Sequence, residues 1–317
     1  MNKVLRIGTR DSQLAVWQAT LVQAQLLQQG ITTELVYIKS DGDIDLVTPL
    51  YEIGVQGIFT KTLDAALLSN RIDIAVHSMK DVPTQLAQGI IQAAVLMRAS
   101  YKDIFVYKNN AVIHAWELNN LQISSPSAAR GIIATSSTRR KAQWLNRYPH
   151  HKIENLRGNV NTRLRKVTES GWDGAIFAAA GLERIGLRPE KSVELDWMLP
   201  APAQGAIMIV CREEDTAAKD ICILLNDTTT ALCTKIERDF LKTLFGGCST
   251  PISALAELKE GTVFFQGNIL SPDGKDKMES AMNVPLLQSA ALGIQAAKKL
   301  LEEGADKIVA AIRDAGK

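Results

Sequence analysis

The strongest constraint on the fold is an alternation of short apolar runs with longer amphipathic segments in the first hundred residues. The predicted strands are residues 4–9, 33–39 and 72–76, and the predicted helices are residues 14–29 and 58–69. Asp11 or Ser12 is suited to cap the first helix, and Gly30 is suited to end it. This order, with short connections, predicts a parallel, doubly wound sheet.

The same alternation returns after about Tyr101. The predicted strands are residues 131–135, 152–156 and 174–178, with one helix capped by Ser136 or Ser137 and running to Leu145, and another at residues 160–170. A further apolar strand at residues 206–210 follows a proline-rich crossing, which indicates a return of the chain to the first domain.

From about Thr216 the pattern changes. We expect a helix at residues 227–245, strands at 252–258 and 262–270, and a helix at 286–303. The fold class is therefore α/β, with two doubly wound domains and a smaller α+β C-terminal domain. The expected domains are residues 1–101 with 199–215, then 102–198, then 216–317.

Composition narrows the functional classes. The net charge of +2 is too small to favour nucleic-acid binding through bulk electrostatics. The first residues lack the apolar core of a signal peptide and no run approaches membrane-spanning length, so we expect a cytoplasmic protein without a membrane partner. The cysteines are too far apart for a CxxC metal or redox site, and we expect Cys211, Cys222 and Cys233 to pack as small hydrophobic residues.

The predicted strand 72–76 runs directly into the polar sequence His77-Ser78-Met79-Lys80-Asp81. Ligands of open α/β sheets bind beyond the carboxyl ends of parallel strands, so this polar sequence is a candidate site. Pro83 predicts that Asp81 lies in an extended loop rather than a helix. Taken alone, this short sequence is more typical of an ordinary polar loop with a chance Lys-Asp pair.

Arginines also gather at predicted strand and helix ends. They are Arg10, Arg139, Arg140, Arg157, Arg163 and Arg184. A guanidinium binds carboxylates through two parallel hydrogen bonds, each worth about 1.5–3 kcal/mol, and the helix starts after Ser12 and Ser137 add backbone donors. Any one of these arginines alone is typical of a solvated surface, but the set predicts a ligand with many carboxylates or with phosphates. The chain has no GxGxxG or Walker A sequence to support nucleotide binding.

Cys248 follows two glycines and precedes Ser249-Thr250-Pro251. The glycines remove side chains next to the sulfur, so the thiol is a candidate nucleophile or attachment point. The short sequence alone fits an ordinary free loop cysteine equally well.

Together these segments resemble the porphobilinogen deaminase (hydroxymethylbilane synthase) family. The resemblance covers essentially the whole chain, through residues 7–18, 77–83, 134–140, 156–163 and 246–252. It implies a monomeric cytoplasmic enzyme of tetrapyrrole (haem) biosynthesis, with two domains like the lobes of periplasmic binding proteins. It further implies that the third domain carries a dipyrromethane cofactor, joined by a thioether to Cys248. Four porphobilinogens are added in turn to the growing polypyrrole chain, each losing ammonia, and water releases hydroxymethylbilane.

The resemblance also implies residue roles. Asp81 is the expected catalytic residue, because its carboxylate stabilises the positive charge of the azafulvene that deamination produces; whether Asp81 or a water protonates the leaving amine stays open. Residues expected to bind cofactor or substrate carboxylates are Arg10, Ser12, Lys61, Ser78, Lys80, Thr135, Ser136, Ser137, Arg139, Arg140, Arg157, Arg163, Arg184 and Gln204. No metal is expected.

Residues 41–57 are expected to form a lid over the cleft. This segment departs from the family, which commonly has a lysine where Gln56 stands, and Gln56 brings no charge to an anion. Residues 202–205 also differ from the commoner Val-Gly-Gln-Gly form, although Gln204 is retained.

Two other functions remain open from the sequence. A catalytically silent two-lobed binding protein for a polycarboxylate or an oxyanion explains the arginines but not Cys248 on its glycine loop. A phosphate-sugar enzyme lacks any phosphate-loop sequence.

Overall fold

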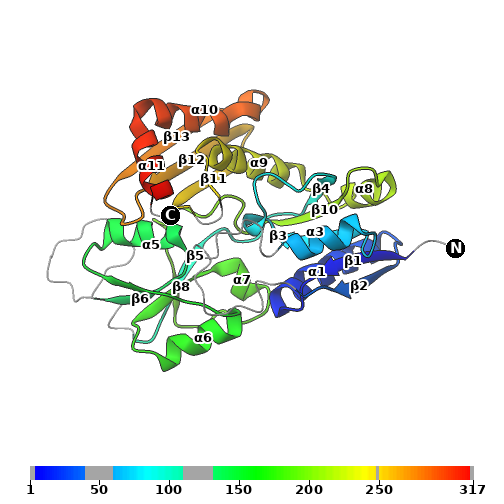
Figure 1. The fold of residues 1–317 in the computed structure, drawn as a ribbon, viewed down its shortest axis with the longest axis horizontal. Helices are drawn as coiled ribbons and strands as arrows, with labels where there is room; N and C mark the ends of the chain where they lie inside the picture. The colour runs from blue at the N-terminus through cyan, green and yellow to red at the C-terminus, as the bar shows by residue number, and fades with distance from the viewer. Residues whose placement is uncertain (1–3, 40–59, 110–130, 248–249, 315–317) are drawn as a thin grey trace.

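The computed structural model describes residues 4–39, 60–109, 131–247 and 250–314. Within these residues the chain forms three separate sheets, each covered by helices (Figure 1). Cys248 and the expected lid at 41–57, with Gln56, lie outside the described residues.

The first sheet has the strand order β2-β1-β3-β10-β4. Its strands are β1 (Leu5–Thr9), β2 (Thr33–Tyr37), β3 (Ile74–Ser78), β4 (Ile90–Val95) and β10 (Ile207–Arg212). β1 is parallel to β2 and β3, whereas β10 is antiparallel to both β3 and β4. The expectation of an all-parallel sheet is therefore wrong. The chain returns from the second domain at the carboxyl end of β3, where Ile207 pairs with Ser78, and so β10 must run in the opposite direction.

Helices cover both faces of this sheet, as expected for a doubly wound domain. They are α1 (Gln13–Gln28), α3 (Lys61–Leu68) and α8 (Thr216–Ile223). Ile74 and Val76 of β3 pack in the same core as α1, while Ala75 between them packs in the core of α3 on the other face. Ser12 is the N-cap of α1, where its side chain accepts a hydrogen bond from the Ala15 amide.

Helix α8 follows the expected domain boundary at residues 215 and 216, yet it packs on the first sheet. Ala218 and Cys222 of α8 are buried in the same core as β10 and α1 of the first domain. Their apolar side chains complete the face of the sheet that α1 leaves open near β4, so this domain continues past residue 223. Cys211, Cys222 and Cys233 are all buried thiols, as expected, and burial raises the pKa of Cys222 to about 12.

The second domain is built in the same way, with the strand order β7-β6-β8-β5-β9. Its strands are β5 (Asp103–Tyr107), β6 (Ile132–Ala134), β7 (Lys152–Glu154), β8 (Gly174–Ala178) and β9 (Ser192–Glu194), and its helices are α5 (Thr138–Arg147), α6 (Val160–Glu169) and α7 (Ala179–Glu183). α5 packs on one face through Trp144, while α6 and α7 pack on the other through Val167 and Leu182. This sheet is also mixed, because β5 is antiparallel to β8 and β9.

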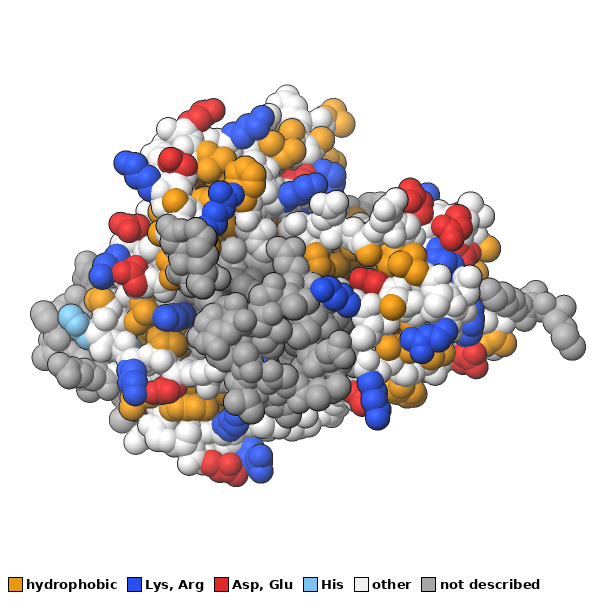
Figure 2. Space-filling view, in the orientation of Figure 1, with side chains coloured by type: hydrophobic (Ala, Val, Ile, Leu, Met, Phe, Trp, Pro, Cys, Tyr) orange, Lys and Arg blue, Asp and Glu red, His pale blue; other side chains and the backbone are white. Residues whose placement is uncertain are grey.

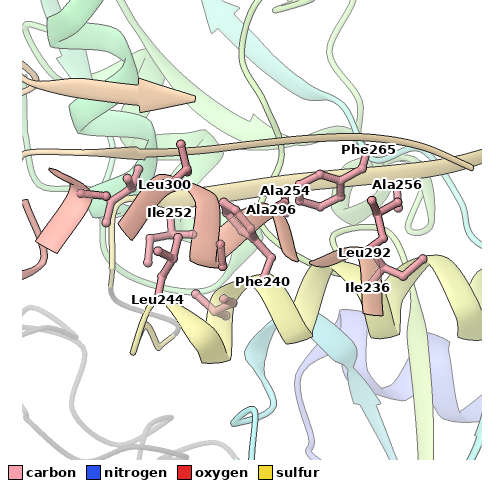
Figure 3. Close-up of a cluster of buried hydrophobic side chains, with 14 of the residues drawn as sticks. Ile236, Phe240, Leu244, Ile252, Ala254, Ala256, Phe265, Leu292, Ala296 and Leu300 are labelled. Atoms are coloured by element: carbon pink, nitrogen blue, oxygen red, sulfur yellow. The ribbon is translucent and has the colours of Figure 1, made fainter. Parts of the chain in front are cut away.

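The third domain is an antiparallel sheet with helices on one side. It contains α9 (Thr228–Thr243), β11 (Ile252–Lys259), β12 (Thr262–Leu270), β13 (Lys277–Pro285), η2 (Leu286–Ala291), α10 (Leu292–Leu300), η3 (Leu301–Ala305) and α11 (Asp306–Asp314). Phe240 of α9 and Phe265 of β12 pack together in its core, with ring centroids 5.1 Å apart (Figure 3). β13 was not expected from the sequence. The single helix expected at residues 286–303 is three successive elements, η2, α10 and η3. Gly304, whose φ of 109° is left-handed, interrupts the helical backbone within η3.

The segment that carries Asp81 differs from its expected backbone. β3 continues to Ser78, and Met79–Asp81 (η1) forms one turn of 3-10 helix rather than an extended loop. Pro83 restricts only the residue before it, and Val82 is indeed extended with φ −87° and ψ 130°. Asp81 is two residues from the proline and is not constrained by it.

Two features are absent from the described residues. No helix there is long and apolar enough to cross a bilayer. No group of three or more His, Cys, Asp or Glu side chains there is arranged to hold a metal ion. On the face shown in Figure 2, basic and acidic side chains are interspersed.

Candidate active site

Lys80 and Asp81 project from the short turn that follows β3. Their neighbours Met79 and Val82 are almost fully buried, at 1% and 2% exposure, and the Met79 amide donates to the Ala206 carbonyl at 3.1 Å. Lys80 is half-buried and Asp81 is exposed. The turn is thus anchored by apolar side chains on either side of the two polar residues, which fixes where Lys80 and Asp81 can reach.

Lys80 and Asp81 both act electrostatically on side chains of the second domain. Burial lowers the pKa of Lys80 to about 8; Asp81 and Asp103 oppose the shift, and the charges of Arg140 and Arg139 favour it. Burial also lowers the pKa of Arg163 to about 10, with Arg140 and Arg157 adding to the shift and Asp81 opposing it. The turn after β3 therefore faces the arginine-rich edge of the second domain.

Arg139 and Arg140 share one buried carboxylate, that of Asp103. Arg139 Nη2 lies 2.7 Å from Asp103 Oδ2, while Arg140 donates to Oδ1 from Nε and Nη2 at 3.0 and 2.7 Å. Burial opposes ionisation of Asp103, but the two guanidinium groups outweigh it and hold its pKa at about 2. Two cations against one anion leave the cluster with one net positive charge beside Lys80.

The sequence predicted the two arginines of this cluster as site residues, but it did not predict Asp103. The arginines were predicted to meet ligand carboxylates, whereas the structure also gives them a carboxylate inside the protein. Arg139 further donates to the Leu199 carbonyl at 2.6 Å, and Arg140 to the Ile176 carbonyl at 3.1 Å. Asp103 itself was missed, although an acidic residue at the start of the apolar run of β5 was an available signal.

Arg157 and Arg163 flank the start of α6. Asn159 caps this helix by accepting from the Thr162 amide at 2.9 Å, and Arg163 Nε donates to the Gly158 carbonyl at 2.6 Å. Arg157 is 6% exposed. Asn161 Nδ2 donates to Gln13 Oε1 of α1 at 2.9 Å, so the starts of α6 and α1 meet across the two domains.

On the first domain, Arg10 follows β1, and its charge helps burial to lower the pKa of His77 to about 4. Ser12 caps α1, as described above. Ser78 exchanges hydrogen bonds with the Gln18 amide group of α1, at 2.8 and 3.3 Å. Lys61 is the first residue of α3, and its side chain is exposed.

The hydroxyl groups at the start of α5 are used within the second domain. Ser137 is the N-cap, accepting from the Arg140 amide, and Thr135 accepts from the Ser137 amide at 3.2 Å. Ser136 Oγ lies 2.5 Å from the Leu156 carbonyl and accepts from the Leu156 amide at 3.0 Å. These contacts fix the backbone that presents Arg139 and Arg140.

Gln204 and Arg184 lie where the chain crosses between the first two domains. Gln204 is 1% exposed and donates to the Tyr101 carbonyl at 2.7 Å and to Asp103 Oδ1 at 3.0 Å. Arg184 donates to the Gly205 carbonyl at 2.7 Å, and its guanidinium carbon lies 5.7 Å from the centre of the Trp17 ring. Both side chains thus tie the crossing segment to the domains on either side.

Gly247 and Thr250, which lie on either side of residues 248 and 249, are hydrogen-bonded to each other. Thr250 Oγ1 donates to the Gly247 carbonyl at 2.7 Å and accepts from the Gly247 amide at 3.2 Å. A Cβ atom on Gly246 would lie 2.6 Å from both Ile252 Cδ1 and Leu241 Cδ1, so a larger residue there would force these side chains to move. Gly246 thus packs against the core of the third domain, and Gly247 and Thr250 are joined by hydrogen bonds.

These donors fit a ligand with several carboxylates, because lysine and arginine side chains of both domains converge on one region while Asp81 supplies an isolated negative charge there.

Comparisons with known proteins agree with this chemistry. Residues 5–220 match the family described as "Porphobilinogen deaminase, dipyromethane cofactor binding domain", and residues 231–302 match "Porphobilinogen deaminase, C-terminal domain". The porphobilinogen deaminase of Syntrophotalea carbinolica is 41% identical over 98% of this chain and 96% of its own length. That of Acidithiobacillus ferrooxidans is 39% identical over 98% of this chain and 99% of its own.

Solved structures with a similar arrangement are more distant. The VFT2 domain of Bordetella pertussis BvgS has a TM-score of 0.42 and 14% identity, covering 69% of this chain and 84% of its own. A periplasmic substrate-binding protein of an ABC transporter from Coxiella burnetii has a TM-score of 0.41 and 14% identity, covering 72% of this chain and 94% of its own. The sequence relatives alone carry the assignment, and on their evidence the chain belongs to the porphobilinogen deaminase family.

Proposed function

We propose that this chain is a hydroxymethylbilane synthase that condenses four porphobilinogens, releases ammonia at each addition and hydrolyses the product from a covalent dipyrromethane. The observation that carries the proposal is the position of Asp81. It lies exposed on a well-anchored turn of the first domain, within the electrostatic reach of Lys80 and of Arg163 in the second domain.

Asp81 is the group we assign to the reacting pyrrole. Loss of ammonia from porphobilinogen leaves a positive charge that extends to the pyrrole nitrogen, and a fixed carboxylate stabilises that charge as it develops. The buried neighbours Met79 and Val82 hold the turn in place, so the carboxylate does not have to be reorganised during the reaction.

The basic residues bind the carboxylates of the pyrrole rings. Each pyrrole ring of the growing chain brings an acetate and a propionate, so the site needs many positive groups in a small space. Lys80, Arg10, Arg157, Arg163 and the net positive Arg139–Asp103–Arg140 cluster supply them. The other expected site residues shape the site and position its hydrogen-bond donors. They are Ser12, Lys61, Ser78, Thr135, Ser136, Ser137, Arg184 and Gln204.

Cys248 is the proposed point of cofactor attachment through a thioether. The dipyrromethane, when bound, supplies the pyrrole carbon onto which the chain is extended. The hydrogen bonds between Gly247 and Thr250 and the close packing of Gly246 fix the residues on either side of Cys248 in the third domain, which suits an attachment point for a chain of rings. A cytoplasmic location and a monomeric state stay predictions from the sequence.

Intact mass tests the proposal directly. The purified protein should exceed its sequence mass by two pyrrole units, and Cys248→Ser should lose that increment while Cys222→Ser keeps it, because Cys222 is buried in the first domain. Active protein with the unmodified mass would refute the covalent cofactor. A silent polycarboxylate-binding protein would release no ammonia from porphobilinogen.

The role of Asp81 needs its own measurement. Asp81→Asn keeps the size of the side chain but removes its charge, so it should keep the pyrrole adduct and the melting temperature while losing nearly all ammonia release. Glu213→Gln, at an exposed acid of the same domain, is the matched control and should behave as wild type. Near-normal turnover by Asp81→Asn would rule out the assignment.

A further inference from the structure

Arg238 of the third domain binds the turn that carries Asp81 in the first domain. Its Nη1 donates to the Val82 carbonyl at 2.9 Å and to the Met79 carbonyl at 3.4 Å, and its Nη2 donates to the Pro83 carbonyl at 2.5 Å. One guanidinium therefore donates hydrogen bonds to three backbone carbonyls, which lie on both sides of Asp81 in the chain. Such charge-assisted hydrogen bonds are stronger than neutral ones, and they fix geometry as well as energy.

The helix that carries Arg238 also leads to the proposed cofactor loop. α9 ends at Thr243, five residues after Arg238, or about 8 Å along the helix axis. Ile236, Phe240 and Leu244 bury the opposite face of this segment in the core of the third domain (Figure 3). α9 is thus a rigid connection between the turn of Asp81 and the loop of Gly246 and Gly247.

We propose that Arg238 is a positioning residue, which sets the place of the Asp81 carboxylate relative to the loop that carries Cys248. The inference rests on the proposed catalytic role of Asp81. Nothing in the reaction requires Arg238 to touch substrate; its effect passes through the backbone of residues 79–83. A displacement of about 1 Å in a catalytic group is enough to cost about 100-fold in rate.

Arginine is suited to this position in a way that lysine is not. A planar fork with five N–H groups reaches several carbonyls at once, whereas an ammonium is a compact charge on a flexible stem. Arg238→Lys should therefore keep the charge and much of the packing while losing the simultaneous hold on the three carbonyls.

A groove beside Arg238 provides both a control and a route for chemical rescue. It has a volume of about 490 Å³ and is lined by Met79, Met208, Leu232, Arg238 and Lys242, among others. Lys242 lies one helical turn after Arg238 on the same face of α9, and its side chain is exposed. Lys242→Ala thus removes a cation from the same surface without removing the bonds to the turn.

The first experiment compares Arg238→Ala with Lys242→Ala in the cofactor-bearing enzyme. Arg238→Ala should lower kcat by about 10- to 100-fold, with KM for porphobilinogen changed less than threefold, because the basic groups of the second domain are untouched. Intact mass should show the pyrrole adduct in both variants. Guanidinium ion at millimolar concentration should enter the vacated space and restore part of kcat in Arg238→Ala only.

A double-mutant cycle with Asp81→Asn separates positioning from simple support of the fold. If Arg238 acts through Asp81, then Arg238→Ala should lower turnover little further once Asp81 is Asn. Should Arg238→Ala fail to fold, Arg238→Lys carries the same comparison, with an expected loss in kcat of about tenfold or more at an unchanged melting temperature.

These experiments distinguish a failure of the proposed role of Asp81 from a failure of the inference about Arg238. Near-normal turnover by Asp81→Asn would overturn the proposed function of that residue and this inference with it. Loss of turnover in Asp81→Asn, together with wild-type kcat in the Arg238 variants or with fully additive effects in the cycle, would overturn only the inference about Arg238.

Discussion

Arg98 and Glu237 form a bidentate ion pair at the point where the three domains meet. Arg98 Nη1 and Nη2 donate to the two oxygens of Glu237 at 2.6 and 3.1 Å. The Glu237 side chain is fully buried, and its carboxylate also accepts from the amides of Ala203 and Ala256 at 2.6 and 2.8 Å. One carboxylate from α9 therefore holds the connection leaving the first domain, the crossing segment that returns to it and the sheet of the third domain.

Removing this carboxylate should strongly destabilise the protein. In Glu237→Ala, the Arg98 guanidinium, whose side chain is only 11% exposed, and two amides lose their acceptor, so the free energy of unfolding should fall by about 3–5 kcal/mol. Urea titration followed by circular dichroism measures the change, and Glu213→Ala, at an exposed position, should have almost no effect. Replacing both partners, in Arg98→Met with Glu237→Leu, should recover part of the loss; a double variant less stable than Glu237→Ala would contradict this explanation.

The lowered pKa of Lys80 predicts a pH dependence of catalysis. Its ammonium loses its proton near pH 8, so kcat/KM should decline as the pH rises through 8, because a neutral amine binds a carboxylate weakly. Lys80→Arg should move the decline to higher pH. Lys80→Gln should show no decline there and should be about 10- to 100-fold lower at pH 7, which corresponds to one charge-assisted hydrogen bond of about 1.5–3 kcal/mol. A decline that persists unchanged in Lys80→Gln would assign it to another group.

Asp64 should make stability depend on pH in the opposite way to a paired carboxylate. Burial raises its pKa to about 6, although a hydrogen bond with Thr60 opposes the shift, and it lines a small cavity of about 20 Å³ with His77. Between about pH 4 and 6 the folded state binds more protons than the unfolded state, so the contribution of Asp64 to stability is lost as the pH rises.

Asp64→Asn removes this titration. The melting temperature of the variant relative to wild type should rise between pH 5 and about 6.5 and then stay level. Asp220→Asn, at an exposed position on α8, should show no such trend. A constant difference between Asp64→Asn and wild type across the whole range would show that Asp64 keeps its ordinary pKa.

Gly246→Ala should disturb the cofactor loop from within the third domain. The new Cβ atom would lie 2.6 Å from two buried side-chain carbons and 2.9 Å from Thr250 Oγ1, so these side chains or the backbone of Gly246 must shift. Overpacking of this kind costs about 1–3 kcal/mol. We expect a lower melting temperature and a smaller fraction of protein carrying the pyrrole mass. Gly171→Ala, where no atom lies within 4 Å of the new Cβ, is the control; equal cofactor content in both variants would contradict the prediction.

Local patterns determined a large part of the site. The turn with Lys80 and Asp81 is where the apolar run of β3 ends, and Ser12, Ser137 and Asn159 cap their helices through contacts with residues three positions away. Such features depend on neighbours along the chain, so they can be read from the sequence. The family blocks, which cover the whole chain, identified the family for the same reason.

Only the tertiary structure decided which of the basic groups share a partner and how the domains are joined. Asp103 is 36 residues before Arg139, and Glu237 is 139 residues after Arg98, yet each pair is in direct contact. The direction of β10, the position of α8 in the first core and the hold of Arg238 on the turn of Asp81 arise in the same way. The amino-acid sequence by itself determined which groups can do the chemistry. Burial and contacts between distant segments determined their charge partners and their pKa values, because these depend on neighbours that no local pattern records.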